Sequence, residues 1–332
     1  MTKHKFNLTI HEYAEENLNE WDNFVANSNN GTIFHLQKFL KYHTVGKFEF
    51  THYIVRKDGQ IVAVLAGGFK ENGNIYWSPV GASYGSLVTD DLPFELSLAI
   101  VDEVINFFKS KGTREIFLIP PPLIYSKIYN QHLEYAMLYR HFDFEYHYIS
   151  HSIDLAIDYK NHYNRATKFK FNKIKKNADL TILQKNDFEV FYPILVENKK
   201  KHNATPTHSF EDLQKLNALL PDKLKLFIAY YKDTPIAGHL VFLSNQNVAL
   251  CFYNAMDYKY EKLFPAYALA EFVIDWSKEN GYKWFDFGVS QDTTSDNPMT
   301  PSISLIQFKE NFNTRGIFRS TYHLKLNDCN DC

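Results

Sequence analysis

Two ten-residue stretches, IVRKDGQIVA at residues 54–63 and AYYKDTPIAG at residues 229–238, decide the fold of this chain. An offset of 175 residues aligns the pair KD at 57–58 with the pair KD at 232–233. In each stretch apolar and β-branched residues flank a short polar turn, a pattern that predicts two strands joined by a hairpin. The chain therefore contains the same local unit twice.

A helix and a strand follow each hairpin. Apolar residues at helical spacing predict amphipathic helices over residues 94–111 and 265–280, and each helix ends near a glycine. The hydrophobic strands EIFLI at 115–119 and WFDF at 284–287 come next. Each copy reads as β-β-(β)-α-β, and a period of roughly 170 residues suits two duplicated domains better than a solenoid.

This pattern predicts an α+β fold, a mixed α/β sandwich of two tandem domains, each with a mixed sheet flanked by helices. We place the first domain at residues 1–149, the second at 150–327 and a polar tail at 328–332. A duplicated domain brings two clefts, of which only one needs to keep its chemistry.

Bulk composition indicates a globular protein. The chain has 332 residues, 45% of them hydrophobic and 16% aromatic, enough to bury one large core or two medium ones. A net charge of −2 and a pI near 6.7 argue against a global field that would bind DNA or a membrane surface. The N-terminal stretch has no apolar signal segment, and no window approaches the roughly 18 apolar residues of a membrane span. We therefore expect a cytoplasmic protein without integral membrane contact.

Motifs of the common enzyme classes are absent from the sequence. The chain has no GxGxxG after a strand, no GxxxxGK[ST], no GxSxG and no HExxH. Cys251 lies between Leu250 and Phe252 in an apolar strand, which favours a core thiol over a nucleophile. Cys329 and Cys332 have the spacing of half a zinc site but no second pair nearby. Neither a disulfide framework nor a metal site is predicted.

Several short motifs follow one another along the chain in a defined order. They are GASYG at 81–85, IY at 124–125, EN at 197–198, PTHS at 206–209, FDFG at 285–288 and QFKENF at 307–312. In this order they resemble the tandem GNAT-fold proteins related to the Fem-type peptidoglycan-bridge aminoacyltransferases. They resemble still more closely the GNAT-like proteins encoded among surface-polysaccharide genes. The resemblance extends from about residue 21 to residue 326.

The resemblance implies transfer of an acyl or aminoacyl group from a thioester or ester to an amine or hydroxyl. GNAT chemistry is a direct attack, so it needs a donor cradle and an acid or base but no covalent nucleophile. The usual acyl-CoA signature, Arg/Gln-x-x-Gly-x-Gly/Ala, is missing before the second long helix, where the chain reads KLFPAY at 262–267. Acyl-CoA, including acetyl-CoA, and the aminoacyl-tRNA used by Fem-like relatives therefore both stay open as the donor.

Three residues are candidates for acid-base catalysis. His208 in the PTHS loop is either a general base or a neighbour of the N-cap of the next helix. Asp286 stands where the first copy has Phe117, so it is either a site acid or the acceptor of a loop hydrogen bond. Tyr253, in the strand before the second long helix, is either a proton donor or a core residue.

A basic segment lies at the start of the second domain. Residues 160–176 carry seven lysines and arginines and no acidic residue. We take Arg165, Lys173 and Lys176 as donor-binding candidates because long cationic side chains can bind phosphates of CoA or tRNA; the alternative is a solvated helix face. Lys262, where the glycines are missing, and Lys309, in QFKENF, complete the candidate set. Lys309 could pair with Asp286 or with a donor phosphate; the alternative is a surface lysine.

We therefore expect a GNAT-type acyltransferase without a metal. Its acceptor would be an amino or hydroxyl group on a cell-envelope sugar or on its lipid- or nucleotide-linked precursor. The expected partners are this small-molecule or lipid-linked acceptor and, for an aminoacyl donor, tRNA. The second domain and the cleft between the domains should hold the site. The alternative is a non-catalytic binding protein in polysaccharide biosynthesis that kept the duplicated fold but lost donor binding.

Overall fold

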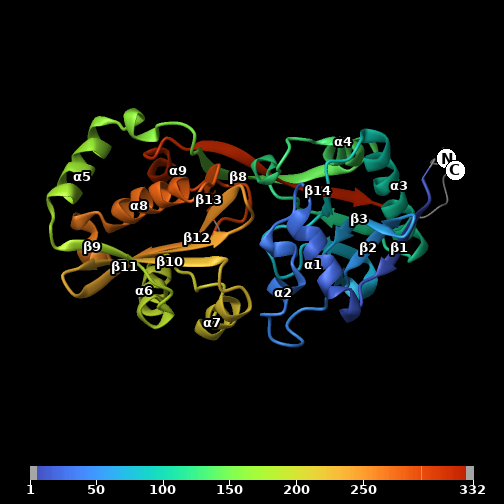
Figure 1. The fold of residues 1–332 in the computed structure, drawn as a ribbon, viewed down its shortest axis with the longest axis horizontal. Helices are drawn as coiled ribbons and strands as arrows, with labels where there is room; N and C mark the ends of the chain where they lie inside the picture. The colour runs from blue at the N-terminus through green and yellow to red at the C-terminus, as the bar shows by residue number, and fades with distance from the viewer. Residues whose placement is uncertain (1–5, 293, 327–332) are drawn as a thin grey trace. The chain divides into compact units, whose positions relative to one another are not determined.

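The computed structural model describes residues 6–292 and 294–326, and the chain divides into two compact units (Figure 1). The first unit extends to Tyr148 and resumes at Phe318, and the second is Ile149–Ile317. The expected second domain, 150–327, included the last strand, but this strand counts with the first unit from Phe318 onward because it pairs with a strand of that unit. The tail at 328–332, with Cys329 and Cys332, lies outside the described residues.

The first unit contains two sheets, with strand orders β1-β2-β3-β6 and β4-β5-β7-β14. Its strands are β1 (Leu8–Glu12), β2 (Tyr53–Lys57), β3 (Gln60–Leu65), β4 (Gly68–Lys70), β5 (Ile75–Ser78), β6 (Leu87–Thr89), β7 (Glu115–Leu118) and the end of β14 (Arg315–Lys325). Its helices are α1 (Leu18–Asn27), α2 (Gln37–Leu40), α3 (Phe94–Ser110) and α4 (His132–Tyr139), with short 3-10 turns at Glu15–Asn17, Ile33–His35, Glu71–Gly73 and Leu123–Tyr125.

Helix α3 supplies much of the core of the first unit. Its apolar stripe, which includes Ile100, Val104 and Phe108, is buried against β-strand residues such as Val55. The helix is followed by Gly112, whose φ of 74° is a left-handed conformation that glycine adopts without strain. The stripe and the glycine are the two signals that predicted this helix from the sequence.

The second unit is built on one sheet, with the strand order β8-β13-β12-β11-β10-β9. Its strands are the part of β8 (Asp143–Asp154) from Ile149 onward, β9 (Leu180–Gln184), β10 (Leu224–Tyr231), β11 (Thr234–Leu243), β12 (Val248–Met256) and β13 (Trp284–Val289). Its helices are α5 (Arg165–Lys176), α6 (Phe188–Lys201), α7 (Phe210–Leu219), α8 (Pro265–Glu279) and α9 (Ile303–Glu310), with 3-10 turns at Tyr159–His162 and Tyr258–Leu263.

Helices cover both faces of this sheet. Figure 1 shows α8 on one face and α6 with α7 on the other. Helix α6 packs so closely on β11 that a Cβ at Gly238 would lie 2.3 Å from the Phe191 ring. Glycine is therefore required at this position for the close approach of helix and strand.

The duplication seen in the sequence is present in the backbone. The hairpins β2-β3 and β10-β11 are antiparallel, and the pairs β5-β7 and β12-β13 are parallel and are joined through α3 and α8. The predicted helices 94–111 and 265–280 each end one residue earlier than expected. The prediction of mixed sheets flanked by helices is confirmed in each unit.

Candidate functional site

The end of strand β13 is the first part of the candidate site. β13 runs parallel to β12, where the last direct pair is Leu250 with Asp286, and antiparallel to β8 on its other side. The register with β8 shifts between Asp286 and Val289, and Gly288 in this irregular segment has a φ of 72°. Such bulges bend a strand and redirect the groups at its end. The polar contacts described next gather at this bend.

Asp286 is fully buried and fixed by two hydrogen bonds. Its Oδ1 accepts from the Ser150 hydroxyl at 2.7 Å and from the backbone N–H of Gly288 at 2.8 Å. A buried carboxylate needs such donors to offset its lost hydration. Of the two roles expected for Asp286, the structural one, acceptance of a hydrogen bond from the segment that follows it, is therefore present in the Gly288 contact. The carboxylate also acts electrostatically on Lys309 and His151.

Lys309 lies in the last turn of α9 and is only 3% exposed. Its Nζ donates to the carbonyl oxygens of Gly288 at 2.7 Å and Val289 at 2.8 Å, and to the Ser290 hydroxyl at 2.9 Å. An ammonium has three protons, so these contacts use all of its donors. Lys309 thus binds the bent end of β13. It is buried, whereas the other candidate lysines are exposed.

Two pKa values are shifted at this end of the strand. Burial lowers the pKa of Lys309 to about 8, against the opposing effect of the Asp286 charge. His151, whose Nδ1 lies 2.9 Å from the Ser290 hydroxyl oxygen, has a pKa lowered by burial and by the charge of Lys309. Clusters of perturbed groups of this kind are enriched at functional sites. Ser150, His151 and Ser290 were not among the predicted residues.

His208 and Tyr253 form the second part of the candidate site. His208 is 3% exposed; its Nδ1 lies 2.9 Å from the Tyr253 hydroxyl oxygen, to which its backbone N–H also donates at 3.2 Å. Burial raises the pKa of Tyr253, so the phenol keeps its proton at neutral pH and can donate it. Ser209 is the N-cap of α7, accepting from the backbone N–H of Asp212 at 3.1 Å. His208 is therefore both the neighbour of a cap and the partner of a buried phenol.

A bulge in β12 lies beside this pair. Successive pairs between β11 and β12 skip Phe252, which is thus an extra residue in β12. Phe252 stacks on Phe242 with centroids 4.4 Å apart, and its ring centroid lies 5.2 Å from that of His208. Bulges take a residue out of the regular ladder and are common next to active sites. The His208–Tyr253 contact therefore sits at an irregular point of the central sheet.

The remaining candidates are exposed and cationic. Helix α5 begins at an N-cap, Asn164, whose side chain accepts from the backbone N–H of Thr167 at 2.8 Å, and it buries Phe171 on its one apolar side. Its other sides are basic. The exposed candidates are Arg165, Lys173 and Lys176 on α5 and Lys262 before α8. Within the described residues none of these four forms an ion pair, so their charges are available to an anionic ligand.

Helix α5 brings cations to the N-terminus of α8. The Lys170 ammonium donates to the Tyr267 hydroxyl at 2.5 Å, and the Lys173 ammonium lies 5.9 Å from the Phe264 ring centroid. Phe264 caps α8 with a φ of 57°, and Pro265 takes the first helical position. The N-terminus of a helix favours anions. Here lysine side chains lie beside it where the usual signature would have glycines.

The structure thus divides the eight predicted residues into three groups. His208 lies with Tyr253 and Asp286 interacts with Lys309. Of the four exposed cations, three are on α5, where Lys173 lies near Phe264 at the start of α8, and Lys262 precedes α8 in the chain. Lys170, which completes the last group, was missed among seven basic residues. Only the tertiary contact with Tyr267 distinguishes it.

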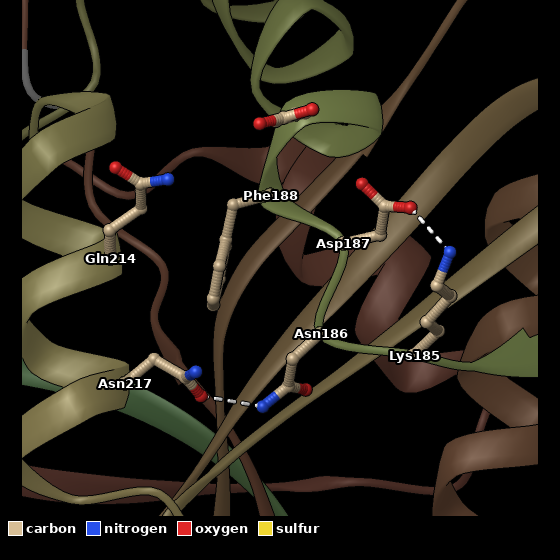
Figure 2. Close-up of a pocket in the computed structure, with 7 residues that line it drawn as sticks. Lys185, Asn186, Asp187, Phe188, Gln214 and Asn217 are labelled. Carbon is tan, nitrogen blue, oxygen red and sulfur yellow. Dashed lines mark hydrogen bonds and ion pairs between the residues drawn. The ribbon is translucent and has the colours of Figure 1, made fainter.

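One hollow of the second unit lies away from the predicted site residues. Figure 2 shows this hollow of about 410 Å³, between the start of α6 and α7, lined by Asn186, Asp187 and Asn217 among others. Its polar groups pair with one another: Lys185 with Asp187 at 2.8 Å, and Asn186 with Asn217 at 2.7 Å. None of the predicted site residues lines it.

The described residues contain neither a cluster of metal ligands nor a membrane-spanning helix. Within 6–292 and 294–326, no three His, Cys, Asp or Glu side chains come close enough to hold a metal ion. No helix in the same part of the chain is both long and apolar enough to cross a bilayer.

Solved structures show the class of fold. FemX matches with a TM-score of 0.70 and 13% identity, over 95% of this chain and 97% of that one. The C-terminal domain of a protein described as a lysylphosphatidylglycerol synthetase of Agrobacterium fabrum matches at 0.58 and 10%, over 93% and 91%. A tandem GNAT protein from the clavulanic acid pathway matches at 0.52 and 9%, over 98% and 100%. The predicted architecture of two tandem GNAT-like domains is confirmed.

The family follows from the sequence match. The FemAB family matches residues 138–319, more than half of the chain, and the chain belongs to this family. Membership supports acyl or aminoacyl transfer as the class of reaction. A search of curated proteins finds no match. The expected link with surface-polysaccharide genes stays a prediction.

Proposed function

We propose that this protein transfers an acyl or aminoacyl group to an amino or hydroxyl group of a cell-envelope sugar, or of its lipid- or nucleotide-linked precursor. The observation that carries the proposal is the FemAB match, because residues 138–319 contain all eight predicted site residues. The name of one structural relative, lysylphosphatidylglycerol synthetase, refers to an aminoacyl group on a lipid. This supports an aminoacyl donor and an acceptor from the cell envelope.

The reaction is a direct transfer. The acceptor nitrogen or oxygen attacks the carbonyl carbon of the donor, a new C–N or C–O bond forms, and the C–S or C–O bond to the leaving group breaks. The attacking group loses a proton and the leaving group gains one. Cys251 is a poor covalent nucleophile, because it is buried and burial raises the pKa of its thiol to about 12.

We assign the two proton transfers to the His208–Tyr253 pair. With the Nδ1 proton directed at the Tyr253 oxygen, the other ring nitrogen of His208 accepts the proton of the attacking group. Tyr253 gives its hydroxyl proton to the leaving group. The resulting phenolate is stabilised by two donors of His208, the ring Nδ1–H and the backbone N–H. Passage of the Nδ1 proton to the phenolate restores Tyr253 and leaves His208 neutral with its proton on Nε2. Loss of this proton to solvent and uptake of one at Nδ1 return His208 to its starting tautomer.

Asp286 and Lys309 act as positioning residues in this proposal. Together they fix the bent end of β13, Asp286 through Gly288 and Lys309 through two backbone carbonyls. The donor phosphates bind the exposed cations Arg165, Lys173 and Lys176 of α5 with Lys262, near the α8 N-terminus. Side chains thus replace the missing glycines in phosphate recognition.

A transfer assay tests the proposal. Purified protein is incubated with radiolabelled acetyl-CoA, longer acyl-CoAs or aminoacyl-tRNA, each with amino sugars and with nucleotide-linked sugars as acceptors. We expect label to move from one donor class to an acceptor, and His208→Ala to lower the rate of this transfer about 100-fold or more. If calorimetric titration at low salt shows that no donor binds, the non-catalytic alternative replaces the proposal.

A further inference from the structure

In the Gly/Tyr-rich loop at residues 81–86 of the first unit, side chains from elsewhere in the unit bond to the backbone carbonyl groups of every second residue. His43 bonds to the carbonyl oxygen of Gly81 at 2.6 Å, and His35 to that of Gly85 at 3.0 Å. Between them the Arg319 guanidinium, reaching from β14, donates to the carbonyl oxygen of Ser83. The loop is thus fixed from three sides, and only Arg319 brings a permanent charge to it.

Arg319 has no counter-charge within the described residues, unlike two other arginines of the first unit. Arg56 is paired with Glu20 at 2.6 Å, and Arg140 forms a two-fold ion pair with Asp102. Among residues 6–292 and 294–326, no carboxylate pairs with Arg319. A partly buried guanidinium without an anion is costly unless its donors are satisfied.

The donors of Arg319 are only partly used. Its Nε is buried and no acceptor of the described chain lies within hydrogen-bonding distance of it. A buried donor left in this state destabilises the fold. The guanidinium lies 5.1 Å from the ring centroid of Tyr84 and 5.9 Å from that of Tyr148, so two aromatic rings hold it in place. A carboxylate or phosphate would complete this set of donors with two parallel hydrogen bonds.

We propose that Arg319, with Tyr84, Tyr148 and the loop at 81–86, binds an oxyanion group of the acceptor substrate. The assignment of this anion to the acceptor rests on the proposed function, but the anion site itself stands on the geometry of Arg319. The recognised chemistry is a carboxylate or a phosphate in contact with a guanidinium. This site lies within the first unit and is separate from the cations of α5.

The competing explanation is that Arg319 serves only to hold the Ser83 carbonyl. A lysine in its place could still donate to that carbonyl but would lack the planar fork that binds an oxyanion at two points. Arg319→Lys therefore separates the two roles. Arg315→Lys is the matched control, because Arg315 lies on the same strand, is exposed, and bonds only to carbonyls of its own turn.

The arginine Nε–H signals of the full chain, observed by NMR, give a direct test. The sequence has few arginines, at positions 56, 114, 140, 165, 315 and 319, so each signal can be identified from single Arg→Lys variants. Separate titrations use inorganic phosphate, pyrophosphate and succinate. We expect saturable movement of the Arg319 signal with the phosphates or with succinate, while the Arg315 signal stays in place. The anion that acts identifies phosphate or carboxylate as the source.

Calorimetry on variants completes the test. In a background that carries Lys173→Ala and Lys176→Ala, Arg319→Lys should weaken binding of the active anion at least about tenfold, and Arg315→Lys should not. The proposal is overturned if no anion moves the Arg319 signal, or if it moves without saturation and in parallel with Arg315. Because Arg165 reports separately on the α5 cations, failure at Arg319 is distinguishable from failure of the proposed donor site.

Discussion

The two β-α-β copies use one strand position for opposite purposes. In the first copy Phe117 of β7 stacks between Trp77 and His323, with ring centroids 4.3 Å and 4.0 Å away. In the second copy the same position is Asp286 of β13, whose carboxylate holds the bend at Gly288. The comparison teaches that a duplicated scaffold can keep one copy for packing while the other exchanges an aromatic ring for a buried charge.

The change of residue comes with a change of neighbours. Phe117 pairs with His323 of β14, a ring that lies 2.7 Å from Glu115 and 3.0 Å from Glu145. Asp286 instead pairs with Ser152 of β8, and Ser150 of the same strand donates to it. A carboxylate can be buried at this position of the second copy because the Ser150 hydroxyl of β8 and the Gly288 N–H donate to it.

Removing the aromatic ring of the first copy should have the largest effect on stability. We expect Phe117→Ala to lower the free energy of unfolding of the first unit by about 3 kcal/mol, because a buried ring and two stacking contacts are lost. Urea unfolding followed by circular dichroism measures this. Phe318→Ala, at a phenylalanine that is 67% exposed, is the control and should change it little. If both variants change the free energy of unfolding equally, the packing role assigned to Phe117 in the first copy is wrong.

Removing the polar groups of the second copy should affect turnover instead. We expect Asp286→Asn and His208→Ala each to lower the transfer rate about 100-fold or more, equivalent to about 2.7 kcal/mol, while the midpoint of thermal unfolding changes little. Steady-state kinetics and calorimetry on the same samples separate the two effects. Loss of folding in both variants would assign these residues to the structure alone.

The sequence predicted the parts of this comparison that depend on local pattern. The hairpins, α3 and α8 follow from apolar spacing and from the glycines at 112 and 281, signals contained within a few turns of chain. The exchange of Phe117 for Asp286 was also visible, because aligning the two copies puts one residue on the other.

The partners of these residues could not be predicted in the same way. Lys309 was a candidate to pair with Asp286 or with a donor phosphate, or to be a surface lysine. Its ammonium donates to the carbonyl oxygens of Gly288 and Val289 at a bulge that no sequence pattern predicts. Ser150 reaches Asp286 from 136 residues away, and Arg319 reaches the loop at Ser83 from 236 residues away. Contacts of this range depend on how strands pair, which local propensity does not determine.

The pH dependence of stability tests the buried polar groups of the second copy, through Lys309. The pKa of Lys309 is about 8 in the folded chain, against a reference value of 10.5. Between these values the unfolded chain binds the extra proton, so the free energy of unfolding rises with pH. The rise attributable to Lys309 is about 1 kcal/mol between pH 8 and pH 9. We expect this rise in the free energy of unfolding to be absent in Lys309→Met, as measured by urea unfolding at pH 8 and at pH 9.

The control for this prediction is Lys278→Met, at an exposed lysine in the last turn of α8. This variant should keep the full rise, because Lys309 and its buried contacts are unchanged in it. A rise of unchanged size in Lys309→Met would show that another group titrates in this range. Lys309 would then be an ordinary buried cation rather than one poised to lose its proton.

The smallest effect should come from the exposed lysines of the second copy. Lys173 and Lys176 form no ion pair within the described residues, and Lys173 lies near Phe264 at the start of α8, where the chain lacks glycines. We expect Lys173→Ala with Lys176→Ala to weaken donor binding about fivefold and to flatten its dependence on salt, because each phosphate contact releases counterions. The change of slope should be greater for aminoacyl-tRNA than for CoA. Calorimetric titration at two salt concentrations measures it, with Lys278→Ala as the control. An unchanged slope in the double variant would make α5 a solvated helix face and leave the start of α8 without a cationic donor site.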